Sequence, residues 1–258
     1  MSRFDGATVL ITGATGGLGS GAAEAFAAEG ARLVLSDLDE GSLRNFASTV
    51  DAECAILAGN IAEEKLSEDL VGLAVEKFGQ LDVAVNNAGI VHSFVRLPQV
   101  TSEEARRVLE VDLLGVFYAM KHQILRMERQ YKESGKGGVI VNVASVAGLS
   151  GAPKLSVYAA AKHGVIGLTR SAAAEYATKG VRINAVCPAH TRTAMVDGFV
   201  RSSGAGEADA LAELTRGVPM KRVGEVDEIT TGILFLADPA NSFMTGHALA
   251  LDGGIGAV

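Results

Sequence analysis

The chain has little cysteine and no sequence pattern typical of a metal site. Its 258 residues include two cysteines, Cys54 and Cys187, which lie inside short apolar runs and lack the spacing of metal ligands. Such cysteines suit a reducing compartment and predict a packing role. The five histidines are scattered and form no HExxH pattern, so the sequence gives no support to a catalytic metal.

The chain also lacks a run of cationic residues and a long apolar segment. Lys and Arg total 23 against 30 Asp and Glu, for a net charge of -7, which argues against a nucleic-acid partner. No segment offers the roughly 20 apolar residues that a membrane-spanning helix needs. The first apolar run leads straight into a glycine turn, as a strand would and a secretion signal would not. We therefore expect a soluble, cytoplasmic protein with no membrane partner.

Short β-branched runs alternate with longer helical patterns almost from end to end, and 48% of the residues are hydrophobic. This alternation predicts an α/β fold in which helices cover a parallel sheet. The strands are nearly continuous in apolar character, which fits burial on both faces, and the length suits a single domain over residues 1–258. The expected strands are Thr8–Ile11, Arg32–Ser36, Cys54–Ala58, Val83–Val85, Val139–Val143, Arg182–Val186 and Ala248–Leu251.

Helical patterns fill the gaps between these strands. They include Leu18–Glu29, a long helix that begins at Thr101, where Thr101 and Glu104 form a capping box, and the stretches Val157–Lys179 and Glu225–Ala237. The mixed segment 194–219 follows the strand that ends near Cys187. Ligands bind outside the carboxyl ends of the strands in such sheets, so we expect this segment to be a mobile lid over the substrate.

A glycine-rich turn, TGATGGLG, joins the first strand to the first helix and contains Gly13, Gly17 and Gly19. Glycine permits positive φ and a close backbone approach, and free N–H groups at a helix start attract a pyrophosphate. The spacing is neither GxGxxG nor that of a P-loop, whose Lys and Ser/Thr are missing, so a dinucleotide is favoured over ATP. The alternative is a turn needed only for packing.

Asp37 closes the second strand, where an acidic residue accepts hydrogen bonds from the adenosine ribose of a dinucleotide. Its charge would repel a 2'-phosphate, so the sequence favours NAD over NADP. The alternative is a solvated loop carboxylate.

Tyr158 and Lys162 stand four residues apart and so share one face of a helix. A neighbouring ammonium favours the ionised phenol, and a phenol that titrates near neutrality is an efficient acid and base. Moving its pKa down from ~10 by roughly 3 units corresponds to about 4 kcal/mol. The pair alone is also typical of a solvated helix face.

The glycine-rich turn, Asp37, the NNAG of residues 86–89, Ser145, the YAAAK that contains Tyr158 and Lys162, and the closing TGHALALDGG occur in this order. Together they resemble the short-chain dehydrogenase/reductase family, collinearly from about Thr8 to Gly254. The resemblance implies a Rossmann-type, doubly wound and mostly parallel seven-stranded sheet with helices on both faces. It also implies a nicotinamide cofactor and reaction at an alcohol or carbonyl carbon.

The resemblance implies four catalytic residues. Tyr158 is the acid/base, Lys162 holds the nicotinamide ribose and lowers the Tyr158 pKa, Ser145 binds the substrate oxygen, and Asp112 belongs to a proton relay. The implied cofactor contacts are Gly13, Thr15, Gly17, Leu18, Gly19, Asp37, Leu38, Asn60, Ile61, Asn87, Ala88, Gly89, Tyr158, Lys162, Pro188, Thr191 and Thr193. For Asn87 to Gly89 the alternative is steadying the central strand, and for the two threonines it is local turn capping.

Three positions depart from the family pattern. Asp112 replaces the usual Asn, which predicts retained activity with an altered pH dependence. Asn60 replaces the usual Asp and weakens the adenine contact. Ala189 replaces the usual Gly, so the loop after Pro188 cannot easily take positive φ and its conformation is expected to differ.

The function expected from these residues is NAD-dependent interconversion of a secondary alcohol, alicyclic or otherwise hydrophobic, and its ketone. His92 and His190 are candidates to orient a polar substituent. The apolar candidates for the crevice are Val91, Phe94, Val146, Leu149, Leu155, Met195 and Phe199.

Two alternatives stay open: a 3-oxoacyl thioester reductase, and a non-catalytic dinucleotide-binding protein on the same fold. A hydrolase is disfavoured because Ser145 lies in VNVASVAG, which is not a GxSxG elbow. Members of the family commonly form homotetramers through the two long helices, here about residues 101–129 and 157–179, and the carboxyl-terminal segment.

Overall fold

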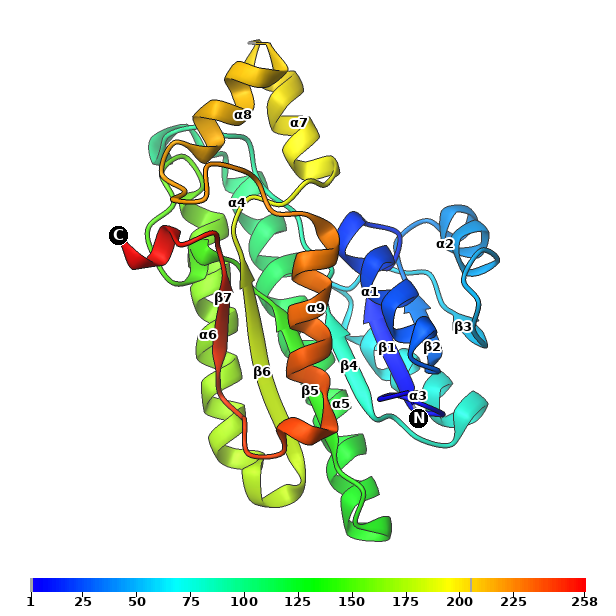
Figure 1. The fold of residues 1–258 in the computed structure, drawn as a ribbon. Coiled ribbons are helices and arrows are strands. Elements are labelled where there is room, and N and C mark those ends of the chain that lie inside the picture. The colour runs from blue at the N-terminus through cyan, green and yellow to red at the C-terminus, as the bar shows by residue number, and fades with distance from the viewer. Residues whose placement is uncertain (1, 205) are drawn as a thin grey trace.

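The computed structural model describes residues 2–204 and 206–258. Seven strands form one sheet in the order β3-β2-β1-β4-β5-β6-β7, and every neighbouring pair is parallel (Figure 1). The strands are β1 (Thr8–Thr12), β2 (Arg32–Ser36), β3 (Cys54–Ile56), β4 (Val83–Asn86), β5 (Gly138–Val143), β6 (Val181–Pro188) and β7 (Ala248–Leu251). The predicted fold class is confirmed. The strand order reverses between β1 and β4, and a ligand crevice forms at such a switch point.

Helices cover both faces of this sheet. Buried side chains of α1, α2 and α9 pack on one face, and those of α3, α5 and α6 pack on the other. The helices are α1 (Gly17–Ala28), α2 (Glu40–Ala47), α3 (Glu64–Phe78), α4 (Ser102–Leu109), α5 (Gly115–Ser134), α6 (Ser156–Tyr176), α7 (Ala194–Ser203), α8 (Glu207–Thr215) and α9 (Val226–Ala237).

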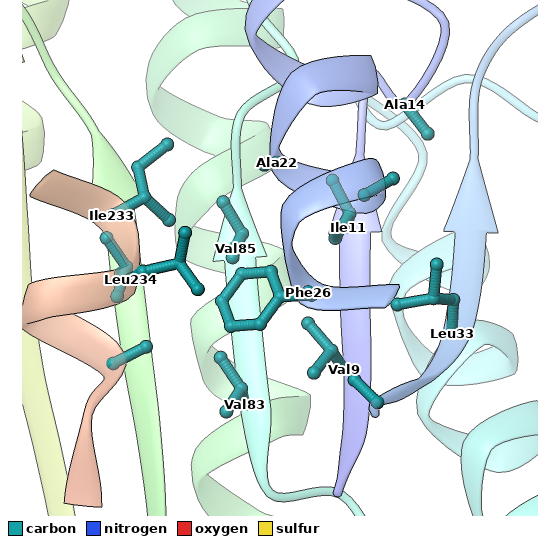
Figure 2. Close-up of a cluster of buried hydrophobic side chains, with 14 of the residues drawn as sticks. Val9, Ile11, Ala14, Ala22, Phe26, Leu33, Val83, Val85, Ile233 and Leu234 are labelled. Atoms are coloured by element: carbon teal, nitrogen blue, oxygen red, sulfur yellow. The ribbon is translucent and has the colours of Figure 1, made fainter. Parts of the chain in front are cut away.

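The core follows from the alternation of side chains along each strand. Successive residues of β1 point to opposite faces, so Val9 joins the cluster beneath α1 and α9, whereas Leu10 joins the cluster beneath α3 and α5. Figure 2 shows the ring of Phe26 from α1 lying among Val9, Val83 and Val85. Because both faces are buried, the strands are hydrophobic at most positions, as the sequence indicated, with a few buried polar residues such as Asn86 and Asn142 among them.

The long helix expected from Thr101 begins as predicted but is not continuous. The Thr101 hydroxyl accepts a hydrogen bond from Glu104 N at 3.1 Å, and the Glu104 carboxylate accepts one from Thr101 N at 3.2 Å, which confirms the capping box. Between α4 and α5 the chain forms a π-helix over Glu110–Leu114. Short π-helical bulges occur often at functional sites, and this one contains Asp112.

Several predicted element ends differ from the observed ones by one residue, and β6 continues to Pro188, two residues beyond the predicted Val186. Two predicted elements were too long. The stretch expected to be helical to Lys179 is α6 only to Tyr176, followed by a 3₁₀ turn over Ala177–Lys179 that ends at Gly180 with φ 73°. The strand expected to reach Ala58 ends at Ile56, because β3 is an edge strand that pairs only with β2.

The segment 194–219 forms α7 and α8, which stand beyond the carboxyl ends of the strands (Figure 1). This location fits the predicted lid, and its mobility stays a prediction. Residue 205 and the side chains of Met195 and Phe199 lie outside what the structure describes. Among the helices that are described, none is long and apolar enough to cross a membrane.

Candidate active site

The site lies where the ends of β4 and β5 meet α6 and the π-helix. Lys162 is at its centre, with a side chain only 4% exposed. Its Nζ donates to the Val143 carbonyl at 3.1 Å, lies 3.3 Å from Asp112 Oδ2, and lies 5.5 Å from the centroid of the Tyr158 ring. The predicted proximity of Tyr158 and Lys162 is confirmed. A solvated helix face is excluded because the ammonium is buried.

Asp112, Tyr158 and Lys162 form what we call the ionisable cluster. The Asp112 side chain is fully buried, and its Oδ1 accepts a hydrogen bond from Ile90 N at 2.8 Å. Its Oδ2 has no hydrogen-bond partner within the described part of the chain, although it forms the ion pair with Lys162. Sequence reasoning placed Asp112 in a relay through its backbone, and the structure adds a direct contact of its carboxylate with Lys162.

The protonation of the cluster differs from the expectation for Tyr158. Desolvation raises the pKa of the Tyr158 phenol above its ordinary value, Lys162 opposes this rise, and the Asp112 charge adds to it. Lys162 therefore lowers the pKa of the phenol as expected, but burial and Asp112 together outweigh the ammonium, so the net direction is upward.

The pKa values of the other two members follow from the same contacts. Burial lowers the pKa of Lys162, but Asp112 and Tyr158 raise it by more, so the net direction is upward. Burial raises the pKa of Asp112 against the opposing effect of Lys162 and of the Ile90 N–H. The pair shares a buried site, so the two groups titrate together and not independently.

Ser145 begins a 3₁₀ turn over Val146–Gly148, directly after β5. Its Oγ accepts a hydrogen bond from Ala147 N at 3.1 Å, and the hydroxyl lowers the pKa of the neighbouring Tyr158. The turn packs tightly on α6, because a Cβ at Gly148 would lie 2.7 Å from the Lys162 carbonyl oxygen. Sequence reasoning missed Gly148, because its spacing from Ser145 alone gives no sign of this close contact with α6.

The glycine turn is a close-packed junction between β1 and α1. Gly13 has φ +65°, and a Cβ at Gly19 would lie 2.0 Å from the Gly13 carbonyl oxygen. Helix α1 has no side-chain hydrogen bond at its N-cap and no acidic residue in its first turn, so its first N–H groups are available to an anion. A pyrophosphate fits this junction, and the predicted contacts Gly17 and Leu18 are in that first turn.

Asp37 lies just past β2 beside the glycine turn. Its Oδ2 accepts hydrogen bonds from Thr15 N at 2.9 Å and Thr15 Oγ1 at 2.5 Å, and its Oδ1 accepts one from Leu38 N at 2.8 Å. The carboxylate is half-buried and fixed in place, so the solvated-loop alternative does not describe it. Leu38 is 67% exposed, as an apolar residue beside a bound ring would be.

The NNAG segment ties β4 to β1. Asn87 Nδ2 donates to the carbonyls of Thr12 and Gly13, at 3.1 and 3.0 Å, while the N–H groups of Asn87 and Ala88 donate to the Thr12 hydroxyl. The alternative role of steadying the central strand is therefore present. Thr12 is the residue that sequence reasoning did not single out, although it opens the glycine motif.

Asn60 and Ile61 differ in their surroundings. Asn60 is exposed and its Oδ1 accepts a hydrogen bond from Ala62 N at 3.1 Å. Ile61 is buried and packs on the start of α5, where a Cβ at Gly115 would lie 3.1 Å from its Cγ2. The amide oxygen predicted to accept from adenine already has this local donor.

The loop after Pro188 reaches the glycine turn, because a Cβ at Gly17 would lie 2.9 Å from Thr193 Cγ2. Thr191 and Thr193 donate hydrogen bonds to the Ala189 and Thr191 carbonyls at 3.1 and 3.2 Å, which is the local capping given as the alternative. Ala189 does not have positive φ, as expected. The loop therefore brings the two halves of the predicted cofactor site into contact.

Two histidines follow the ends of β4 and β6. His92 is 3% exposed, and its Nδ1 lies 2.7 Å from the Ser93 carbonyl, so Nδ1 carries the proton. Among the residues described, no partner contacts its buried Nε2. Burial lowers the pKa of His190. Over the two described ranges, no three His, Cys, Asp or Glu side chains are grouped to hold a metal ion.

Proteins of known name match nearly the whole chain. The family model described as Enoyl-(Acyl carrier protein) reductase matches residues 13–256. The 2,5-dichloro-2,5-cyclohexadiene-1,4-diol dehydrogenase of Sphingobium indicum is 36% identical over 100% of both chains. The cyclohexanol dehydrogenase of an Acinetobacter species (strain SE19) is 36% identical over 98% of this chain and 96% of that protein.

Solved structures show the same likeness. The crystal structure of levodione reductase matches with a TM-score of 0.93 and 35% identity, over 99% of this chain and 100% of that chain. A structure of a protein called ElxO with NADP bound matches with a TM-score of 0.89 and 31% identity, over 98% of this chain and 99% of the other. At these identities and coverages the likeness extends to family membership and not only to the fold.

Proposed function

Because the chain belongs to the short-chain dehydrogenase/reductase family, we propose that it interconverts a secondary alcohol on an alicyclic ring and its ketone, with NAD as cofactor. The observation that carries the chemistry is the ionisable cluster beside Ser145, at the end of the sheet that also holds the glycine turn. The relatives named for cyclohexanol and for a cyclohexadienediol support an alicyclic substrate.

Each side chain has a defined part in this proposal. In ketone reduction the Tyr158 hydroxyl gives its proton to the substrate oxygen, and in alcohol oxidation the phenolate takes that proton back. Ser145 Oγ–H donates a hydrogen bond to the same oxygen, where charge develops. A bound nicotinamide ring supplies or accepts the hydride at the adjacent carbon.

The residues suited to holding the cofactor fall into three groups. The open N–H groups of α1 and the tight glycine turn suit the pyrophosphate. Asp37 suits the adenosine ribose, since its carboxylate is fixed by backbone N–H groups and accepts a hydrogen bond from a hydroxyl, that of Thr15. Lys162 and Thr193 suit the nicotinamide end, because Thr193 contacts Gly17 and Lys162 contacts Tyr158.

NAD is proposed over NADP on electrostatic grounds. The Asp37 carboxylate would lie against a 2'-phosphate, and like charges in contact repel. A matched structure has NADP bound, so the preference of this chain needs a direct measurement. Comparing kcat/KM with the two cofactors at one substrate concentration decides it, and a preference for NADP would contradict the proposal.

The experiment that tests the reaction is a spectrophotometric assay of the purified protein. Cyclohexanol and related ring alcohols with NAD are expected to generate the absorbance of reduced nicotinamide. Tyr158→Phe is expected to lower kcat/KM by about 10²–10⁴ while leaving NAD affinity nearly unchanged. An active Tyr158→Phe variant would refute the assigned chemistry.

One alternative keeps a specific observation in its favour. The matching family model is described as an Enoyl-(Acyl carrier protein) reductase, which shares a carrier-bound thioester with the 3-oxoacyl reductase alternative, although an enoyl reductase acts on a carbon–carbon double bond and not on a 3-oxo group. Acetoacetyl thioester with NADPH therefore belongs in the same assay. If it were used faster than every ring ketone with NADH, the thioester reading would replace the alicyclic one.

We also propose a single NAD-binding domain that assembles as a homotetramer. Helix α5 exposes Phe117 and Leu125, which are 43% and 55% accessible, and apolar side chains gathered on one helix suit burial by another copy. Light scattering is expected to give the mass of four chains. A monodisperse monomer at micromolar concentration would contradict this assembly.

A further inference from the structure

The second oxygen of Asp112 is not needed for the reaction proposed above. Oδ1 accepts the hydrogen bond from Ile90 N, and the amide oxygen of an asparagine would do the same in nearly the same volume. Oδ2 makes no hydrogen bond within residues 2–204 and 206–258 and lies 3.3 Å from Lys162 Nζ. A buried charge is costly unless it is paired, so the carboxylate calls for an explanation of its own.

The segment that follows β4 encloses the pair. A Cβ at Gly89 would lie 3.2 Å from Asp112 Oδ2 and 3.3 Å from Lys162 Nζ, so the backbone of Gly89 covers both groups. The Asp112 and Lys162 side chains are 0% and 4% exposed. Attraction between charges is stronger where water is excluded, which keeps the carboxylate and the ammonium together.

The pair has no net charge. With the proton on Lys162 the charges are one positive and one negative, and with the proton on Asp112 both groups are neutral. A lysine without this carboxylate would instead present one positive charge to Tyr158. The net charge of the pair is zero in both arrangements, and in the ion pair the larger effect of Lys162 on the phenol is offset in part by Asp112.

No other titratable group near Tyr158 restores the missing positive charge. The groups that act on the phenol are Lys162, Asp112 and Cys187, with the hydroxyl of Ser145. Burial raises the pKa of the Cys187 thiol to about 11, so it is neutral at pH 7. Among the described residues, the state of Tyr158 is therefore governed by the Asp112–Lys162 pair and by its own burial.

We propose that Asp112 is a positioning residue that cancels the charge of Lys162, so that Tyr158 faces a neutral pair and remains a proton donor at neutral pH. Its catalytic meaning rests on the proposed function. Ketone reduction uses the protonated phenol and is favoured across neutral pH. Alcohol oxidation uses the phenolate. At pH values below the pKa of Tyr158, the phenolate population increases tenfold for each unit by which pH rises, so this direction is favoured only in alkaline solution.

The test is the titration of Tyr158 itself, which does not depend on turnover. The chain has four tyrosines, so labelling tyrosine with ¹³C at Cζ gives few signals, and the signal that Tyr158→Phe removes is that of Tyr158. Asp112→Asn is expected to lower the titration midpoint of Tyr158 by about one unit, because one like charge is removed. An unchanged midpoint in a folded Asp112→Asn protein would overturn the proposal.

Two further variants keep the test decisive if Asp112→Asn does not fold. Lys162→Met leaves the carboxylate alone and is expected to raise the Tyr158 midpoint above that of the unsubstituted chain. The double variant Asp112→Asn/Lys162→Met is again neutral, so its midpoint is expected to return near the original value. If the Tyr158 midpoint of the double variant equalled that of Lys162→Met, Asp112 would not act on Tyr158 through its charge.

The control is Asp82→Asn. Asp82 is a half-buried carboxylate that also accepts a backbone hydrogen bond, from Thr8 N at 2.8 Å, but it lies at the other end of β1. Its substitution is expected to leave the Tyr158 midpoint unchanged, and an equal shift would show that Asp112→Asn acts through general destabilisation.

Kinetics then separate this inference from the proposed function. If ring alcohols are oxidised, Asp112→Asn is expected to raise the oxidation rate about tenfold at pH values below both Tyr158 midpoints. As pH rises, the rate of ketone reduction is expected to begin its decline about one pH unit earlier than in the unsubstituted chain. If no protein turns over ring substrates but the midpoints follow the predicted order, the proposed function fails and the charge cancellation stands. Turnover without the predicted order refutes the charge cancellation alone.

Discussion

Two buried polar clusters lie in neighbouring elements and differ in how fully their groups are paired. One comes from β4, β5, α5 and α6, and the other comes from the π-helix and α6 and contacts the Val143 carbonyl at the end of β5. The first, which we call the amide network, consists of Asn86, Gln123, Asn142 and Thr169, all at most 2% exposed. Asn86 and Gln123 exchange hydrogen bonds at 3.1 and 2.8 Å, and Asn86 donates to Asn142 at 2.9 Å. Asn142 donates to Thr169 at 2.9 Å, and Thr169 donates to a backbone carbonyl of its own helix.

The ionisable cluster lies beside this network. Asn142 directly precedes Val143, whose carbonyl accepts from Lys162. Here the groups are charged, and Asp112 Oδ2 has an ion pair but no hydrogen bond in the part of the chain that the structure describes. A fully paired neutral network fixes the arrangement of its elements, whereas a cluster of perturbed titratable groups is suited to moving a proton. The first is expected to set stability and the second to set chemistry.

Lys162→Met is expected to have the largest effect, because it removes a charged group from the ionisable cluster and so lowers both activity and stability. Removing one preorganised charged donor lowers kcat/KM by about 10²–10³, and leaving Asp112 buried without a partner costs about 3 kcal/mol of stability. Lys162 opposes the rise that burial gives to the pKa of Asp112, so the folded-state pKa of Asp112 rises further in the variant. The destabilisation is therefore largest at high pH, where the carboxyl is ionised, and diminishes as pH falls and the carboxyl becomes protonated. Urea unfolding at pH 5 and pH 8 measures this difference. Equal losses at both pH values would contradict the pairing.

Asn142→Leu breaks the amide network instead. Asn86 and Thr169 each lose one partner in the interior, which costs about 2–3 kcal/mol of unfolding free energy. Activity per folded molecule is expected to stay within a few-fold, because no group of the ionisable cluster is removed. Asn45→Leu, at an exposed position of α2, is the matched control and is expected to change stability by less than about 0.5 kcal/mol. If Asn142→Leu lowered kcat/KM per folded molecule by much more than a few-fold, the amide network would also contribute to the chemistry, and the distinction between the two clusters would fail.

Asp37→Ser sharpens the comparison, since Asp37 has hydrogen-bond donors on both oxygens and is nevertheless proposed to bind a ligand. Losing a charged acceptor for the ribose is expected to lower kcat/KM with NAD about 10–100-fold and to improve use of NADP. Asp39→Ser is the control, because Asp39 caps α2 through Ser42 N at 2.7 Å and serine is also a good cap. If both variants shift the NAD to NADP ratio equally, Asp37 is only a structural carboxylate.

His92→Phe is expected to have the smallest effect. Its buried Nε2, like Asp112 Oδ2, has no hydrogen-bond partner in the described residues, so we expect it to accept a hydrogen bond from a second polar group on the ring. The KM for a ring alcohol with a second hydroxyl is then expected to rise about 5-fold, which corresponds to about 1 kcal/mol, while the KM for cyclohexanol stays the same. Equal changes for both substrates would indicate a packing role.

The fold and the members of the site could be predicted from the chain in large part. Apolar runs long enough for strands, separated by helical periods, predict a parallel sheet because both of its faces must be buried. The helical period also places Tyr158 and Lys162 on one face. The end of α6 and the end of β3 were less predictable, because the last residues of an element depend on neighbours that come from elsewhere in the chain.

The sequence by itself determined the layered sheet, the glycine turn and the choice of side chains proposed to react, since these follow from local periodicity and from residue chemistry. Only the tertiary structure decided the charge state that surrounds Tyr158. Asp112 is 50 residues away from Lys162 along the chain, and the π-helix between α4 and α5 brings its carboxylate to 3.3 Å from the ammonium. Desolvation and distance, which together set a pKa, exist only once these distant segments have packed together.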